Sequence, residues 1–78
     1  MENETDVNPT DLAPHQLRVK AEKEELDDKI RKLTTFTGGK IFPTLDKAEQ
    51  DRLLTQLAHM KAYSDVLGER FAAFWVRH

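Results

Sequence analysis

The feature that most limits the fold of this chain is a single break between two long stretches. In both stretches, apolar residues recur with the spacing of a helix. Residues 34–46, TTFTGGKIFPTLD, hold two of the three glycines and one of the three prolines of the 78-residue chain. Glycine and proline at this density predict a turn, and proline stops a helix from running through it. The pattern therefore predicts two helices, over about residues 14–36 and 46–76, joined by this turn.

Both predicted helices have start signals. Pro14 suits the first turn of a helix and would break a helix interior. Asp46, followed by Glu49 three residues later, has the spacing of a capping box. Ahead of the first helix we expect a short helical turn near residues 9–13, and a disordered tail over residues 1–8, where nothing can be buried.

Apolar side chains recur by threes and fours along each predicted helix, which gives each helix one apolar stripe. In an antiparallel hairpin the position numbers of facing residues add to a near-constant total. Four pairs of stripe residues share one total: Leu33 with Leu53, Leu26 with Met60, Val19 with Leu67, and Leu12 with Phe74. This agreement predicts an all-α fold, an antiparallel two-helix hairpin.

One layer of this seam is polar and small. By the same register, Glu22 and Lys23 face Ser64. Gly68, one turn further along, faces Arg18. The candidate binding notch consists of Arg18, Glu22, Lys23, Tyr63, Ser64, Gly68 and Arg70. Two interpretations stay open: a satisfied polar layer that sets the register, or a small pocket for a ligand or for a partner's side chain.

The second predicted helix carries more apolar surface than one hairpin can cover. The candidate interface consists of Ala58, Ala62, Val66, Phe71, Ala73, Phe74 and Trp75. Such a surplus predicts a homo-oligomer or a protein partner. The alternative is that the aromatic residues near the C-terminus fold back onto Leu12 and the N-terminal arm.

Composition narrows the class of protein. A chain without cysteine has no disulfides and no thiolate metal ligands. A net charge of −2, with 33% charged residues, argues against a protein that binds nucleic acids by neutralising phosphates. No apolar run approaches the roughly 20 residues that span a bilayer, and the acidic start does not resemble a signal peptide. We expect one domain, residues 9–78, in the cytoplasm.

No catalytic or cofactor motif is present. Nucleophilic catalysis needs a nucleophile and a base that activates it, and no serine lies in a Gly-x-Ser-x-Gly turn. The histidines are too far apart for a helical zinc site. We therefore expect no enzyme activity, no metal and no cofactor.

The Gly-Gly-Lys of the turn also fails as a phosphate-binding loop. That motif requires a glycine where Thr34 stands, and a serine or threonine where Ile41 follows Lys40. The stretch instead predicts a helix stop in which Gly38 or Gly39 takes the left-handed conformation. We expect the apolar residues after it, Ile41, Phe42 and Leu45, to fold inward and close the end of the hairpin.

A pattern spread over both predicted helices is familiar: Arg18-Val19, Lys32-Leu33, Phe36, Glu49-Gln50, Met60, Tyr63, Leu67 and Arg70. On these residues the chain resembles, across residues 8–74, a family of small phage and prophage helical proteins that is named after a gene product of a crAss-like phage. It implies a phage origin and an accessory role outside the virion, with no activity or catalytic residues to carry over.

Three functions follow as hypotheses. The first is a phage accessory protein that binds and inhibits a host immune protein in the host cytoplasm, in the manner of an anti-CRISPR, as a homo-oligomer without direct nucleic-acid or membrane binding. The second is an oligomeric sponge for a nucleotide immune signal, with pockets lined by Arg18, Lys23, Tyr63 and Arg70. The third is an assembly or structural factor of the phage particle.

Overall fold

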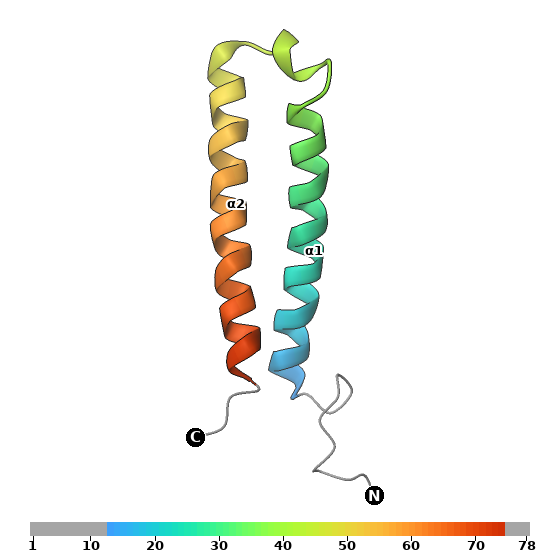
Figure 1. The fold of residues 1–78 in the computed structure, drawn as a ribbon, viewed down its shortest axis with the longest axis vertical. Helices are drawn as coiled ribbons and strands as arrows, with labels where there is room; N and C mark the ends of the chain where they lie inside the picture. Colours follow the sequence, from blue (N-terminus) through green and yellow to red (C-terminus); the bar gives the residue numbers. More distant parts are fainter. Residues whose placement is uncertain (1–12, 75–78) are drawn as a thin grey trace, which may run out of the picture.

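The computed structural model describes residues 13–74, which form an antiparallel hairpin of two long helices (Figure 1). Helix α1 spans Pro14–Thr37 and helix α2 spans Lys47–Ala73, with the 3-10 helix η2, Phe42–Thr44, between them. The predicted all-α hairpin is confirmed. Its starts agree within one residue, and α2 ends before the predicted limit at residue 76. The predicted tail and the turn ahead of α1 lie almost wholly outside the described residues.

The two helix starts use different side chains to satisfy free backbone N–H groups. At α1, Pro14 is the first helical residue, and the Gln16 side chain accepts a hydrogen bond from the Ala13 N–H at 2.8 Å. At α2, the Asp46 carboxylate accepts from the Glu49 N–H at 2.7 Å, as its capping-box spacing predicts. Each start is thus set by the local sequence.

The end of α1 differs from the prediction. Gly38 has φ −93° and ψ 2°, and no glycine in the described range has a positive φ. Its N–H instead bonds back to the carbonyls of Thr34 and Thr35, which tightens the last turn and satisfies these carbonyls without a left-handed residue. The expected left-handed stop at Gly38 or Gly39 is therefore wrong.

Fewer apolar side chains close the turn end of the hairpin than the sequence predicts. Ile41 is 62% exposed and does not fold inward, because it is the capping residue ahead of η2 and its side chain stays in solvent. Phe42 is half-buried and meets Phe36 edge to face, with ring centroids 6.3 Å apart. Leu45 is half-buried as well. Phe42 and Leu45 therefore close this end of the hairpin, and Ile41 does not.

The core is a single seam between α1 and α2. Among the described residues, the buried apolar side chains are Val19, Leu57 and Leu67, and Leu67 has no exposed surface. The other apolar residues of the seam are half-buried: Leu26, Ile30, Leu33, Leu53 and Met60. A pair of helices leaves both edges of its seam open to water, so most stripe residues are covered on one side only.

Contacts across the seam confirm the register at its middle. Lys23 bonds to Ser64, and Glu22 bonds to Tyr63, as facing positions predict. The predicted contact between Leu12 and Phe74 lies outside the described residues, and Phe74 meets His15 with ring centroids 6.0 Å apart. In the part of the chain that the structure describes, neither helix has an apolar stretch long enough to cross a membrane.

Candidate functional site

The middle of the seam holds a closed network of three polar side chains, which we call the polar layer: Lys23, Asp27 and Ser64. Ser64 is only 5% exposed, and its hydroxyl accepts from the Lys23 ammonium at 2.8 Å and donates to the Asp27 carboxylate. The same ammonium lies 3.2 Å from the Ser64 carbonyl oxygen and 3.2 Å from Asp27 Oδ2. No buried polar side-chain atom of the described residues lacks a partner. The polar layer is therefore fully satisfied.

Gly68 makes room for this network. A Cβ atom at Gly68 would lie 3.4 Å from Lys23 Cε and 3.7 Å from Lys23 Nζ, with no other side chain within 4 Å. The prediction that Arg18 faces Gly68 is therefore wrong. Side chains of a helix lean toward its N-terminus, so Lys23 covers the turn before its own Cα and occupies the space opposite Gly68.

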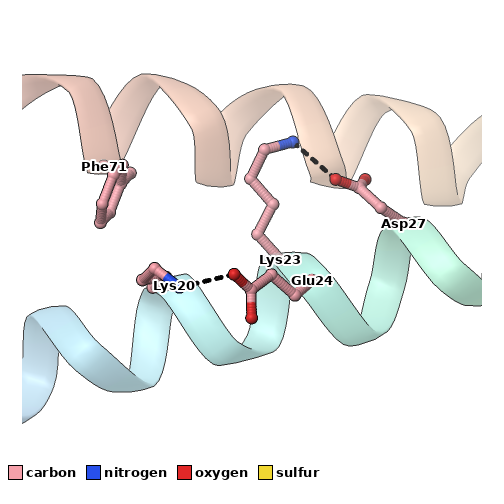
Figure 2. Close-up of a pocket in the computed structure, with 5 residues that line it drawn as sticks. All are labelled: Lys20, Lys23, Glu24, Asp27 and Phe71. Atoms are coloured by element: carbon pink, nitrogen blue, oxygen red, sulfur yellow. Dashed lines mark hydrogen bonds and ion pairs between the residues drawn. The ribbon is translucent and has the colours of Figure 1, made fainter. Parts of the chain in front are cut away.

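A groove opens beside the polar layer along one edge of the hairpin. It has a volume of about 210 Å³ and is lined by Lys20, Lys23, Glu24 and Asp27 of α1 and by Phe71 of α2. Figure 2 shows Phe71 at one end of the groove and Asp27 at the other, with Lys20, Lys23 and Glu24 between them. The four α1 residues share one helix face because they are spaced by three and four.

Each lysine of the groove is paired with a carboxylate of the groove. Lys20 Nζ lies 2.6 Å from Glu24, and Lys23 Nζ lies 3.2 Å from Asp27. The Ser64 hydroxyl, with Lys23 as a second cause, holds the pKa of the Asp27 carboxyl below its usual value. The groove thus presents two ammonium groups and two carboxylates that are already oriented.

Phe71 gives the groove an aromatic wall. Its ring is half-buried and packs edge to face on Phe74, with centroids 5.6 Å apart and an interplanar angle of 73°. Phe74 in turn meets His15 of α1. This small aromatic cluster links the helices where α1 begins and α2 ends. Phe71 and Phe74 therefore pack partly within the hairpin. Leu12, the N-terminal arm and Trp75 lie outside the described residues, so the alternative that the aromatic residues fold back onto Leu12 stays a prediction.

The remaining residues of the predicted notch lie at the other edge of the hairpin. Tyr63 is exposed and donates to the Glu22 carboxylate. This hydrogen bond raises the pKa of the Tyr63 hydroxyl, and the charge of Arg70 acts weakly in the opposite direction. Arg18 is exposed, one turn before Glu22 on the same helix face. The single notch predicted from the sequence is therefore two separate sites, on either side of the seam.

The predicted interface divides in the same way. Ala58, Ala62 and Ala73 are exposed, and Val66 is 48% exposed. Leu54, which the sequence analysis did not select, is 47% exposed. These residues form the outward side of α2, away from α1, whereas Phe71 and Phe74 face the end of the hairpin.

Three groove residues were missed from the sequence: Lys20, Glu24 and Asp27. Their spacing relative to Lys23 was a usable signal, because it places all four on one face beside the apolar stripe. The expectation of no metal site stays a prediction. Within residues 13–74, no three histidine or carboxylate side chains come close enough together to hold a metal ion.

Comparisons with known proteins bear on the identity of the chain. A family model described as Sequestin matches residues 13–73. An uncharacterized 7.5 kDa protein in the denB-rIIB intergenic region of Enterobacteria phage T4 is 40% identical over 63 residues, which cover 81% of this chain and 98% of that protein. No solved structure matches the chain. The resemblance to small phage proteins is confirmed, although neither match carries the name of a crAss-like phage gene product.

Proposed function

The chain belongs to the Sequestin family, and from this premise we propose that it is a non-enzymatic phage protein that sequesters a small anionic ligand with a planar ring, such as a nucleotide immune signal. The family name describes a protein that holds its ligand. The observation that carries the proposal is the groove, where Lys20 and Lys23 lie beside the Phe71 ring. The site of action is the host cytoplasm.

The groove offers a separate partner for each part of such a ligand. An ammonium group binds phosphate oxygens as a point charge, and a phenyl ring stacks on a planar base, which contributes about 1–3 kcal/mol per base. Carboxylate oxygens accept hydrogen bonds from hydroxyl and amino groups of the ligand. Lys20 therefore binds phosphate, Phe71 stacks on the ring, and Asp27 accepts from the sugar or the base, while Lys23 stays bonded to Ser64 and Asp27.

The groove also holds two carboxylates, Glu24 and Asp27, and an anionic ligand binds there only if neither carboxylate repels it. The pair of Lys20 and Glu24 is largely exposed, and an exposed ion pair contributes only about 0–1 kcal/mol. A phosphate can therefore replace Glu24 as the partner of Lys20 while Glu24 turns into solvent. Asp27 stays in place, because the buried Ser64 hydroxyl bonds to it.

Thermal unfolding and calorimetry with a ligand panel test this function. The panel contains cyclic nucleotides and ADP-ribose derivatives, with adenosine and inorganic phosphate as probes for the ring and the charge alone. A ligand at a hundredfold excess over its Kd adds about 2.7 kcal/mol of stability. We expect stabilisation by at least one ring-bearing phosphate compound and weaker binding of both fragments. No response from any compound would overturn the proposal.

Matched variants test the groove. Lys20→Met removes the charge that faces the ligand, and we expect affinity to fall at least tenfold, because hydrogen bonds to charged groups contribute about 1.5–3 kcal/mol. Lys29→Met makes the same change at an exposed α1 position outside the groove and should bind like wild type. Glu24→Gln removes a competing carboxylate and should bind more tightly. Equal affinities for all four proteins would exclude the groove as the site.

A host immune protein is the second candidate target, and the exposed apolar residues of α2, Leu54 and Val66, favour it. Exposed apolar surface of this kind marks binding sites for proteins. Capture from host lysate by wild type, Lys20→Met and Val66→Glu separates the two functions. A host protein that Lys20→Met retains and Val66→Glu loses would support this second candidate.

A further inference from the structure

The edge of the hairpin opposite the groove carries four polar side chains, which we call the arginine edge: Arg18 and Glu22 of α1, and Tyr63 and Arg70 of α2. Tyr63 is 44% exposed, and its hydroxyl donates to the Glu22 carboxylate across the seam. The two arginines are exposed, and within residues 13–74 neither has a hydrogen bond or an ion pair. The other arginines of this range each pair with a nearby carboxylate. This edge therefore offers two guanidinium groups that lack an anionic partner among the described residues.

The register of the hairpin brings these two arginines together. Because Tyr63 bonds to Glu22, counting along the antiparallel helices puts Leu67 level with Arg18. Arg70 comes three residues later, about 4.5 Å further along the axis. Side chains of a helix lean toward its N-terminus, and α1 and α2 begin at opposite ends of the hairpin (Figure 1). Arg18 and Arg70 therefore lean toward each other from the two helices.

The charges of the arginine edge do not cancel. Arg18 precedes Glu22 by four residues, an order that is less favourable for a helical ion pair than acid before base, and the carboxylate bonds to Tyr63 instead. Arg70 lies two turns after Tyr63 on the same face of α2, and its charge reaches the Tyr63 hydroxyl, where it weakly opposes the rise in pKa that Glu22 causes. One carboxylate thus stands against two guanidinium groups, and the edge keeps a net positive charge.

We propose that the arginine edge binds the terminal phosphate group of a small molecule, with Arg18 and Arg70 on its oxygens and the Tyr63 hydroxyl as a third donor. A guanidinium group is a planar fork that matches phosphate oxygens, and its bonds to phosphate are short and strong. A terminal phosphate offers three free oxygens and a charge of about −1.5 to −2. A phosphodiester has fewer free oxygens and less charge. The three donors therefore favour a phosphomonoester over a phosphodiester.

Glu22 is an internal competitor of this ligand. The Tyr63 hydroxyl has one proton to donate, so the phosphate receives it only when Glu22 gives it up. Glu22 is exposed, and a hydrogen bond that water can replace contributes little to stability. A phosphate held by two charged groups therefore displaces the Glu22 carboxylate into solvent. This site goes beyond the proposed function, because it lies across the seam from Lys20 and Phe71 and requires no planar ring in its ligand.

Nuclear magnetic resonance of the full chain tests the site. Tyr63 is the only tyrosine of the sequence, so the signals of its ring report on this edge directly. Methyl phosphate and dimethyl phosphate are the probes, because they differ by one methyl group and neither has a ring that could stack on Phe71. We expect methyl phosphate to shift the Tyr63 signals to saturation, and dimethyl phosphate to bind about tenfold more weakly or less.

Matched variants assign the residues. Arg18→Met and Arg70→Met should each weaken the binding of methyl phosphate about tenfold or more, whereas Glu22→Gln removes the competing charge and should strengthen it. Arg31→Met makes the same change at an arginine that is already paired with Asp28 and should bind like wild type. Circular dichroism checks that all four variants keep their helices.

The following results would overturn the proposal. They are unchanged Tyr63 signals at about 10 mM methyl phosphate, well above a millimolar Kd, equal affinities for the two probes, or equal losses in Arg31→Met and Arg70→Met. Lys20→Met keeps this test separate from the proposed function, because it should lose the groove ligand and still bind methyl phosphate here. If Lys20→Met instead loses methyl phosphate while Arg70→Met retains it, the phosphate lies in the groove, and only the proposed function stands.

Discussion

Two neighbouring layers of the same seam contribute differently to the fold. In one, Val19 and Leu67 occupy facing positions and are both buried, and Leu67 has no exposed surface. In the other, Lys23 and Asp27 bond to Ser64, which is 5% exposed. Burial of apolar surface is favourable but not directional, so the apolar layer supplies stability in several registers. The polar layer is satisfied in one register only, and a buried polar group without a partner is costly. Stability and register thus come from different layers.

The largest effect should come from the apolar layer. Leu67→Ala removes most of a fully buried side chain, and we expect the free energy of unfolding to fall by about 2–5 kcal/mol. Leu17→Ala makes the same change at a side chain that is 39% exposed and should cost much less. Urea denaturation measures both. Equal losses would mean that the seam is not the main source of stability.

A smaller effect should come from the polar layer. Ser64→Ala removes the hydroxyl that joins Lys23 to Asp27, and we expect a loss of about 1–3 kcal/mol. The two charged side chains still pair with each other, so the loss should stay below that of Leu67→Ala. Thr55→Ala, which removes a hydroxyl from an exposed position of α2, is the control. A Ser64→Ala protein as stable as wild type would show that the network adds no net stability.

The smallest effect is a dependence on pH. The Ser64 hydroxyl lowers the pKa of Asp27 in the folded chain, so ionised Asp27 stabilises the fold above the unfolded pKa of about 3.9. This stabilisation is lost as the pH falls through the lower, folded pKa. The gap in unfolding free energy between wild type and Asp27→Asn should therefore narrow as the pH falls below about 4.

The comparison with Asp27→Asn isolates one carboxyl. The pKa of Asp28 is also lowered, mainly by Lys32, but Asp28 is present in both proteins and its contribution cancels. In a Ser64→Ala background the pH dependence of the gap should shrink, because the main cause of the lowered pKa is gone. A gap that stays constant from pH 7 to pH 2 would contradict the role of Asp27.

The fold was accessible from the sequence because one property, apolar spacing, sets both helices and their register. The pairing of Lys23 with Ser64 followed from that register. The groove did not follow, because position counting locates Cα atoms and not the ends of long side chains. Lys23 reaches back over Gly68, and Asp27 bonds across the seam to Ser64. The conformation of Gly38 was missed because the carbonyls near it had another way to be satisfied.

The hairpin topology also favours an order in which the contacts between the two helices form. Phe36 and Phe42 meet across a short loop, Lys23 and Ser64 are 41 residues apart, and His15 and Phe74 are further apart still. Loop closure costs more entropy as the loop lengthens, so we expect the helices to pair first at the turn and then toward the chain ends. We expect Phe71 to join late and to be among the first residues to separate. If the proposed ligand binds between Phe71 and Lys20, we expect it to slow amide hydrogen exchange at this end more than at the turn.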